Sequence, residues 1–252
     1  MKNLMSGFRV FLKWAGSVEA VPENLYSKLI TPRVRRSEQS SEKILETERT
    51  EEILEHLSRY EYASIHHVLL ALLWETGMRM GAAFSLDLTD VDFDEECVKL
   101  VHRPDQGTTL KNGTSGERLI ALSTELMETL EDHVDAIRHD VTDDYGRKPL
   151  LTTEYGRMRH STIRGKINRV TTPCYINDPC PDCEQETDKR CPKAVSPHAI
   201  RRGSITHFLT EDVPVEMVSD RMNVSRKVLD KHYDKRSEEV KLEQRRGYLD
   251  EV

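Results

Sequence analysis

The sequence predicts a mainly α-helical protein with one small antiparallel β-sheet, an α+β fold class. Two observations support this class. Most segments after residue 42 place apolar residues at helical spacing, which is typical of helices that bury one face. Three short segments, 91–93, 97–101 and 118–122, instead have the apolar or alternating pattern of strands. No internal repeat is visible, so a repeat architecture is not expected.

The N-terminal residues are expected to be separate from the main fold. Residues 4–15 read as an amphipathic helix that Gly16 ends. Because no segment precedes this helix to pack against it, we interpret residues 1–16 as the remnant of an N-terminal helical domain. Residues 17–41 contain two prolines, five serines and a basic run, which is the composition of a linker.

The main domain is expected to begin at residue 42 and to continue to residue 252. Residues 42–60 predict an acidic helix with one buried stripe. Residues 62–76 predict a strongly apolar helix, which we expect at the centre of the core. Gly77 should end this helix, and a short helix should start near residues 79–81.

The three strands are expected to form an antiparallel sheet. Val98 and Leu100 alternate with other residues on one strand, and we expect both to be half-buried. On the next strand we expect the same of Leu119 and Ala121. Residues 107–116 join these two strands and contain Asn-Gly, the strongest short-range hairpin signal.

Helices are expected again after the sheet. Ser123 is a suitable N-cap for a helix that continues to about residue 138. Residues 140–149 read as a loop. Further helices are expected from Pro197, after Pro214, around residues 225–231 and over residues 235–248.

The charge is unevenly distributed. The 252 residues carry a net charge of −7, yet residues 41–150 alone hold 24 acidic against 11 basic residues. The two ends of the chain are basic, and Arg outnumbers Lys by 23 to 14. A positive patch for phosphate can therefore coexist with a negative total, and a mildly acidic protein with solvated charges remains the alternative.

The sequence contains no long apolar run and no N-terminal secretion pattern. We therefore expect a cytoplasmic protein. Four of its five cysteines fall within 18 residues, and metal binding is favoured over disulfides in such a setting. Four thiolates suffice for a structural Zn²⁺ site, with a cluster of reduced thiols as the alternative. The predicted ligands are Cys174, Cys180, Cys183 and Cys191, within a Cys-rich insertion over residues 171–196.

A basic segment lies between the sheet and the cysteines. Its side chains could line a helix that contacts DNA phosphates, or could form a solvated face. The candidate DNA-binding residues are Arg157, Arg159, Arg164, Lys166, Arg169 and, further along the chain, Arg202.

The last third of the chain combines residues suited to phosphodiester chemistry. His198 and Arg201 are three residues apart and share one helical face. An Arg can donate two parallel hydrogen bonds to phosphate oxygens, and a His can exchange a proton near neutral pH. Tyr233 is a candidate nucleophile. Arg79, after the Gly77 helix stop, could supply a second positive charge, and Lys111 a proton for the leaving oxygen.

These residues resemble the motifs of the tyrosine recombinases, or phage-type integrases. Thr76-Gly77-Met78-Arg79 followed by Leu86-Asp-Leu-Thr-Asp90 is similar to the first arginine box. Lys111 is similar to the β-hairpin lysine, His198-Ala-Ile-Arg201 to the His-x-x-Arg box, and Tyr233 to the nucleophile. The resemblance covers residues from about 42 to 240, and the Cys-rich insertion looks most like archaeal members, including those of halophiles.

The resemblance implies a fold, a mechanism and partners. The implied fold is the tyrosine recombinase catalytic domain, preceded by a fragment of a core-binding domain. Tyr233 would form a 3′-phosphotyrosyl link to double-stranded DNA while Lys111 protonates the 5′-oxygen. Arg79, Arg201 and His198 would stabilise the phosphorane. No ATP or catalytic metal is needed, and four protomers would act on two duplexes.

The sequence departs from the family pattern at two places. Ala82 stands where an acidic residue is usual, and Asn223-Val224 stand where Gly-His or Gly-Trp is usual. Asn223 or His232 is a candidate substitute for the missing donor. These departures keep two other functions open, namely a catalytically impaired DNA-binding relic or regulator with the same fold, and a zinc-stabilised interaction module.

Overall fold

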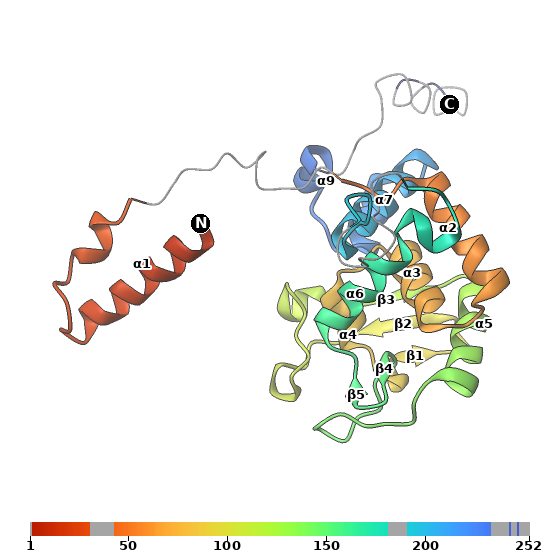
Figure 1. Cartoon of the computed structure of the whole chain (residues 1–252), viewed down its shortest axis with the longest axis horizontal. Coiled ribbons are helices and arrows are strands. Elements are labelled where there is room, and N and C mark those ends of the chain that lie inside the picture. Colours follow the sequence, from red (N-terminus) through yellow and green to blue (C-terminus); the bar gives the residue numbers. More distant parts are fainter. Residues whose placement is uncertain (1, 31–42, 181–190, 233–241, 243–245, 247–252) are drawn as a thin grey trace. The chain divides into compact units, whose positions relative to one another are not determined.

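The computed structural model describes residues 2–30, 43–180 and 191–232, together with residues 242 and 246. The chain divides into two compact units, Met1–Glu42 and Lys43–Val252 (Figure 1). Among the described residues the fold is mainly helical with two small antiparallel sheets, which confirms the predicted class. No described helix is both long enough and apolar enough to span a membrane.

The first unit contains helix α1 (Lys2–Ser17) and a short 3-10 helix at Leu25–Lys28 that packs against it. The helix predicted for residues 4–15 is therefore present. Residues 17–30 are more structured than a linker, because the chain turns back after Gly16, where a Cβ would lie 3.3 Å from the backbone of Glu23. The rest of the predicted linker lies outside the described residues.

Helix α3 (Ile65–Thr76) is the centre of the second unit, as the sequence predicts. It packs against α2 (Thr47–Tyr60), α5 (Thr124–Asp132), α6 (His160–Val170) and α7 (Pro197–Thr210). Its leucines are buried, and burying each such side chain contributes roughly 1.5–3 kcal/mol. Ser64 caps its start by accepting a hydrogen bond from the His67 amide at 3.2 Å.

Gly77 ends α3 in the left-handed conformation, with φ of 54°. A Cβ at this position would lie 2.6 Å from the Met222 sulfur, so a larger residue would also require the buried Met222 side chain to shift. Helix α4 (Met80–Ser85) follows at once, with Arg79 as its N-cap residue. The predicted succession of helix, Gly stop and short helix is confirmed.

The main sheet has the order β1 (Val91–Asp92), β2 (Cys97–Leu100), β3 (Arg118–Ala121), and all its pairs are antiparallel. Val98 pairs with Ile120, and both are buried on the face that joins the helical core. The sequence-based choice of the buried face of β3 was wrong, since Leu119 is 66% exposed. Antiparallel register decides the face, because directly paired residues point to the same side of a sheet.

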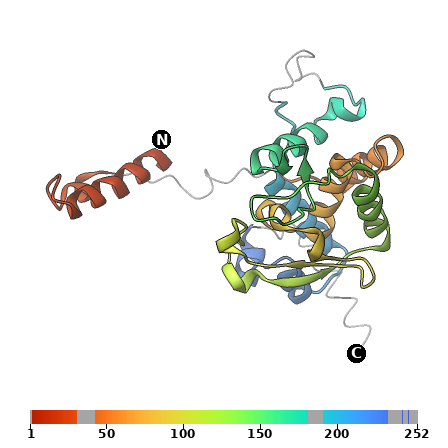
Figure 2. The same ribbon diagram turned by 90° about the horizontal axis from the view of Figure 1, so that it is seen from below.

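A second hairpin, which the sequence did not predict, pairs β4 (Thr152–Thr153) with β5 (Gly156–Arg157). It is too short to give a strand pattern. The strands of both sheets are labelled in Figure 1, and Figure 2 shows the same ribbon turned by 90°. Helix α5 begins at the predicted N-cap Ser123 and continues as a π-helical turn over His133–Ile137.

Three arginines and three aspartates form a largely buried ionic network at the base of the second unit. Asp87 accepts hydrogen bonds from Arg147 and Arg157, and Arg103 pairs with Asp90. Burial would raise the pKa of Asp143, but hydrogen bonds from Arg157 and from backbone amides outweigh it and lower the pKa to about 2. The network fixes the loop at residues 140–149 and the start of the β2–β3 connection.

The C-terminal part contains α7, α8 (Val215–Arg221) and α9 (Arg226–His232). Their apolar residues form a second small core around Met222 and Leu229. Gly203 of α7 allows the chain at Leu45 to cross very closely, since a Cβ on Gly203 would collide with the Leu45 carbonyl oxygen. The Leu45 amide also donates to the Ala199 carbonyl at 3.2 Å. The helix predicted for residues 235–248 lies outside the described residues, apart from residues 242 and 246.

Candidate active site

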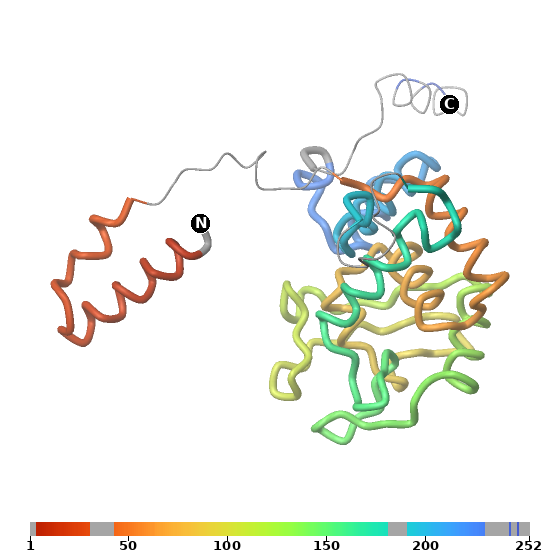
Figure 3. Tube along the Cα trace, in the orientation of Figure 1, coloured from red at the N-terminus to blue at the C-terminus, as the bar shows by residue number. Residues whose placement is uncertain are grey.

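A cleft of about 810 Å³ lies where four distant segments meet, and Arg164 of α6 adds to its lining. These segments are the start of α4, the β2–β3 connection over residues 101–117 (the Lys111 loop), the start of α7 and the corner between α8 and α9. Figure 3 shows how far apart along the chain these segments are. None of the described residues that line the cleft is acidic. The cleft is therefore positive within a chain that is negative overall, as a phosphate-binding site requires.

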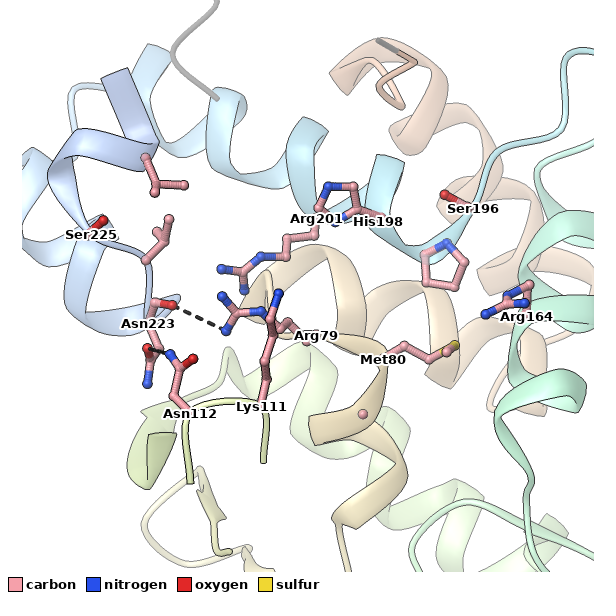
Figure 4. A pocket seen from close by; sticks show the side chains of 14 residues that line it. Arg79, Met80, Lys111, Asn112, Arg164, Ser196, His198, Arg201, Asn223 and Ser225 are labelled. Atoms are coloured by element: carbon pink, nitrogen blue, oxygen red, sulfur yellow. Dashed lines mark hydrogen bonds between the residues drawn. The ribbon is translucent and has the colours of Figure 1, made fainter. Parts of the chain in front are cut away.

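Five basic residues line this cleft, four of which the sequence singled out as catalytic. Figure 4 shows their side chains from four different elements, with the guanidinium groups of Arg79 and Arg201 and the Lys111 ammonium close together. The lining basic residues are Arg79, Lys111, Arg164, His198 and Arg201. The structure thus brings Arg79 and Lys111 into the same cleft as His198 and Arg201, which come much later in the chain.

Arg201 lies at the bottom of the cleft and is only 1% exposed. Its Nη1 donates to the Gly77 carbonyl oxygen at 2.5 Å, and its Nη2 donates to the Met222 carbonyl oxygen at 2.8 Å. Both acceptors are at the ends of helices, where carbonyl groups lack partners within the helix. The ends of α3 and α8 therefore fix the orientation of this guanidinium before any ligand binds.

Arg79 is half-buried at the first turn of α4. Its Nη1 donates to the backbone oxygen of Asn223 at 3.3 Å (Figure 4). A positive charge at a helix N-terminus is unfavourable with respect to the helix dipole, and an anion bound in the cleft would relieve this cost. The arrangement leaves further guanidinium donors of Arg79 for such an anion.

His198 is in the first turn of α7, and its side chain reaches the cleft. Partial burial of the ring lowers its pKa below the usual value, and the positive charges of Arg201, Arg202, Lys111 and Arg79 lower it further. Both effects favour the neutral form of His198, in which one ring nitrogen can accept a proton or a hydrogen bond.

Lys111 is exposed on the Lys111 loop. No hydrogen bond or ion pair joins its ammonium group to any residue within the described part of the chain. The loop itself is well anchored: Leu110 is buried, and its amide donates to His102 Nδ1 at 3.0 Å. The backbone is thus fixed while the lysine side chain extends into the cleft.

Asn223 and Val224 occupy the positions where the sequence lacks the family's Gly and His or Trp. Asn223 keeps the left-handed backbone, with φ of 47°, which Asn tolerates better than most residues. Its side-chain amide, proposed from sequence as a substitute phosphate donor, instead hydrogen bonds to the Lys111 loop. Val224 is buried in the core formed with α7 and α8.

The segment that would carry the nucleophile is only partly described. Helix α9 ends at His232, whose side chain lies outside the described part of the structure. Tyr233 follows it directly in the sequence and lies outside the described residues. Ser225 and Val228, at the start of α9, line the cleft. The roles of Tyr233 and His232 stay predictions.

The basic residues between 157 and 169 have different surroundings in the structure. Arg164 on α6 lines the cleft, while Arg159, Lys166 and Arg169 are on the same helix or its N-cap and remain candidates for DNA contact. The prediction that Arg157 contacts DNA was wrong. Its guanidinium group is instead bound to Asp87, Asp143 and two backbone oxygens. Arg202 is only 6% exposed, so it offers little surface to a DNA backbone.

The cysteine cluster is partly described. Cys180 and Cys191 have their sulfur atoms 3.9 Å apart. Cys174 is exposed on a 3-10 helix over Pro173–Ile176, and Cys183 lies outside the described residues. Within residues 43–180 and 191–232 no group of three potential metal ligands is gathered.

Two contributors to the site could not be identified from sequence. Asn112 hydrogen bonds to Asn223, but in the sequence it reads only as half of an Asn-Gly turn. Arg118 reads in the sequence as an ordinary strand residue, yet its side chain joins the end of the Lys111 loop to α8. Both act through contacts more than 100 residues away, for which a single sequence holds no signal.

A mainly helical domain that holds two arginines, a lysine and a histidine in one cleft has the features of an enzyme class that works on phosphodiesters. Residues 43–239 match the family model described as "Phage integrase family", so this chain belongs to the phage integrase family.

Individual relatives are distant. The chain is 21% identical over 215 residues to tyrosine recombinase XerC of Corynebacterium glutamicum, covering 84% of this chain and 59% of that protein. It is 23% identical over 155 residues to a probable integrase/recombinase protein of Methanocaldococcus jannaschii, covering 61% and 40%. The chain thus spans less than two thirds of either relative.

Solved structures support the fold at still lower identity. The XerA recombinase matches with a TM-score of 0.59 at 17% identity, covering 95% of this chain and 73% of that one. The Tn1549 transposon integrase, solved in complex with a circular intermediate DNA, gives 0.62 at 16% identity, covering 99% and 78%. A lambda integrase dimer bound to a core site gives 0.59 at 11%, covering 92% and 58%. The predicted catalytic-domain fold is therefore confirmed.

Proposed function

We propose that this protein is a site-specific DNA recombinase that cuts and rejoins DNA through a 3′-phosphotyrosyl intermediate. One observation supports this most: Arg79, Lys111, His198 and Arg201 line the same cleft, in a chain of the phage integrase family. Its substrate would be double-stranded DNA with attachment-like sites. Because the proposed substrate is DNA, we also propose that the protein is cytoplasmic. Its similarity to archaeal members of the family stays a prediction.

In the first step, the Tyr233 oxygen attacks the scissile phosphorus as the bond from phosphorus to the 5′-oxygen breaks. The neutral His198 accepts the phenolic proton. Arg201, already fixed by two carbonyl groups, and Arg79 donate to the non-bridging oxygens, where negative charge develops. Lys111 gives a proton to the departing 5′-oxygen. A 5′-hydroxyl from a partner strand reverses these steps, so no ATP or catalytic metal is required.

DNA binding is proposed to use the basic residues of α6 and of its N-cap, of which Arg159 and Arg169 are exposed and Lys166 is half-buried. Arg159, Lys166 and Arg169 would contact phosphates along α6, while Arg164 reaches into the cleft itself. Phosphate contacts position a protein on a duplex and make its affinity dependent on salt. Strand exchange between two duplexes would need four protomers, so we propose a homotetramer on the DNA.

A DNA duplex with a nick close to the cleavage site tests the catalytic proposal. The short 5′-hydroxyl fragment diffuses away after cleavage, so the covalent adduct accumulates and is visible by denaturing electrophoresis. Wild type should form the adduct and Tyr233→Phe should not. Tyr155→Phe, which removes the same hydroxyl from a tyrosine that is 90% exposed, should form it normally. Arg201→Ala should reduce the rate roughly 10²–10³-fold.

A second candidate function is DNA binding without cleavage. Val224 buries its side chain where the family places its last phosphate donor, and Ala82 is buried where an acidic residue is usual. Salt-sensitive DNA binding by wild type with no adduct on any attachment-like duplex would favour this regulator. Absence of DNA binding would favour an interaction module instead.

We also propose a structural zinc ion in the Cys-rich insertion. Thiolates about 2.3 Å from a tetrahedral zinc are about 3.8 Å from one another. The 3.9 Å between the Cys180 and Cys191 sulfurs fits that spacing and is too long for a disulfide. Cys183 and Cys174 are the other proposed ligands. Metal analysis should find about one zinc per chain. Cys180→Ser should abolish binding, whereas Cys97→Ser, in strand β2, should retain it.

A further inference from the structure

We propose that Asn223 is a positioning residue that holds the Lys111 loop in the cleft, so that the Lys111 ammonium meets the departing 5′-oxygen. The inference rests on the proposed function, because it gives Lys111 the role of proton donor. It also assigns Asn223 a task different from phosphate binding. The contact joins the corner between α8 and α9, nine residues before α9 ends, to a loop more than 100 residues earlier.

Both ends of the Asn223 carboxamide bind the Lys111 loop. Its Oδ1 accepts a hydrogen bond from Asn112 Nδ2 at 2.6 Å, and its Nδ2 donates to the Ser115 carbonyl oxygen at 2.8 Å. Asn112 is the direct neighbour of Lys111, and Ser115 is on the far side of the Asn-Gly turn. One side chain therefore bridges the tip of the loop beside the lysine.

A second contact also joins the Lys111 loop to the end of α8. Arg118 Nε donates to the Arg221 carbonyl oxygen at 2.7 Å, and its Nη1 donates to the Gly116 carbonyl oxygen at 2.8 Å. Burial, with a contribution from the charge of Arg79, lowers the pKa of Arg118 to about 10. The guanidinium stays charged at pH 7, so the end of the loop remains attached to the last residues of α8.

The backbone of Asn223 takes part in the catalytic cleft as well. Its carbonyl oxygen accepts from Arg79 Nη1 at 3.3 Å (Figure 4). The adjacent Met222 carbonyl oxygen accepts from Arg201. The corner between α8 and α9 is thus in contact with both arginines and with the loop that carries the lysine, and a shift of this corner would displace all three.

The two hydrogen bonds from the Asn223 side chain to the Lys111 loop form a clamp on that loop. Lys111 needs such a clamp because its side chain is flexible. Lys111 has a long flexible side chain on an exposed loop, and proton transfer requires the donor within about 2.6–3.2 Å of its acceptor. A misplacement of about 1 Å can reduce a rate roughly 10²-fold. A fixed loop tip restricts the Lys111 side chain to a smaller volume near Arg79 and Arg201, and it does so without binding the ammonium group.

Asn223→Gly is the variant that isolates this role. Gly accepts the left-handed backbone that Asn223 adopts, so the variant loses the side-chain hydrogen bonds to the Lys111 loop without adding backbone strain. Asn177→Gly is the matched control, since Asn177 has a similar φ of 62° outside the cleft. Cleavage rates are measured on two nicked duplexes, one normal and one with sulfur in place of the bridging 5′-oxygen. A thiolate leaves without a proton because the pKa of a thiol is only about 8.5.

On normal DNA, Asn223→Gly should cleave roughly 10²-fold more slowly than wild type and Asn177→Gly at the wild-type rate. On the sulfur-containing DNA the defect of Asn223→Gly should largely disappear, as it should for Lys111→Ala. The defect of Arg201→Ala should remain. An equal loss by Asn223→Gly on both duplexes would overturn the proposal, because Asn223 would then act on the phosphate rather than through Lys111.

Amide hydrogen exchange provides a readout that does not depend on cleavage. In Asn223→Gly the amides of residues 110–117 should exchange faster than in wild type and in Asn177→Gly. Unchanged exchange would refute the clamp whatever the cleavage rates are. If wild type forms no adduct on either duplex, the proposed function and the protonation role both fail, and the exchange result still decides whether Asn223 holds the loop.

Discussion

Replacing Gly77 by Ala is expected to destabilise the second unit through two separate costs. A non-glycine residue in the left-handed conformation costs roughly 1–2 kcal/mol. The new methyl group would also lie 2.6 Å from the sulfur of Met222, a fully buried side chain that cannot move aside into solvent. Overpacking of this kind costs roughly 1–3 kcal/mol. The sum, about 2–5 kcal/mol, is a large part of the stability of an ordinary domain.

Gly146→Ala separates the two costs. Gly146 also has a positive φ, 73°, but a Cβ there would meet no heavy atom within 4 Å. We therefore expect a loss of roughly 1–2 kcal/mol for Gly146→Ala and a clearly larger loss for Gly77→Ala, measured by urea unfolding followed by circular dichroism. Equal losses in the two variants would show that Met222 does not constrain Gly77, and the packing argument would fail.

Two further predictions concern buried charge. Arg157→Ala should lower the unfolding free energy by roughly 3–5 kcal/mol, because it leaves Asp87 with one less buried partner. Arg159→Ala should change the unfolding free energy by less than about 0.5 kcal/mol. Similar urea midpoints for both variants would contradict the separation of Arg157 from the residues proposed to contact DNA. Burial lowers the pKa values of His67 and His133 in the folded state, so the unfolded chain binds protons first as the pH falls below about 6.5. The unfolding free energy should therefore decrease from pH 7.5 to pH 5, and stability that is flat or rises over this range would refute the assignment.

Much of the fold could be predicted because its signals are local. Gly77 as a helix stop, Ser123 as an N-cap and the apolar pattern of α3 each depend on a few neighbouring residues. The buried face of β3 could not be predicted in this way. It depends on the pairing of Val98 with Ile120, which a pattern within one strand does not contain.

The candidate site divides along the same line. Arg79, Lys111, His198 and Arg201 could be named because each is part of a short motif, and the structure brings them to one cleft. Arg157 was given the wrong task because an arginine in a basic run looks the same whether it faces DNA or a buried aspartate. The partners of Asn223 were invisible for a similar reason, since Asn112 and Ser115 are meaningful only once the Lys111 loop reaches the corner of α8 and α9.

The close crossing of Leu45 over Gly203 has a mechanical consequence. Leu45 is among the first described residues of the second unit, and its backbone lies directly on the helix that presents His198 and Arg201. Within the second unit the backbone at Leu45 is therefore tied to α7 by a close contact as well as by a hydrogen bond. A bulkier residue at position 203 would force the Leu45 backbone away from α7, so the chain entering the second unit and the helix that carries His198 and Arg201 would lose their direct contact.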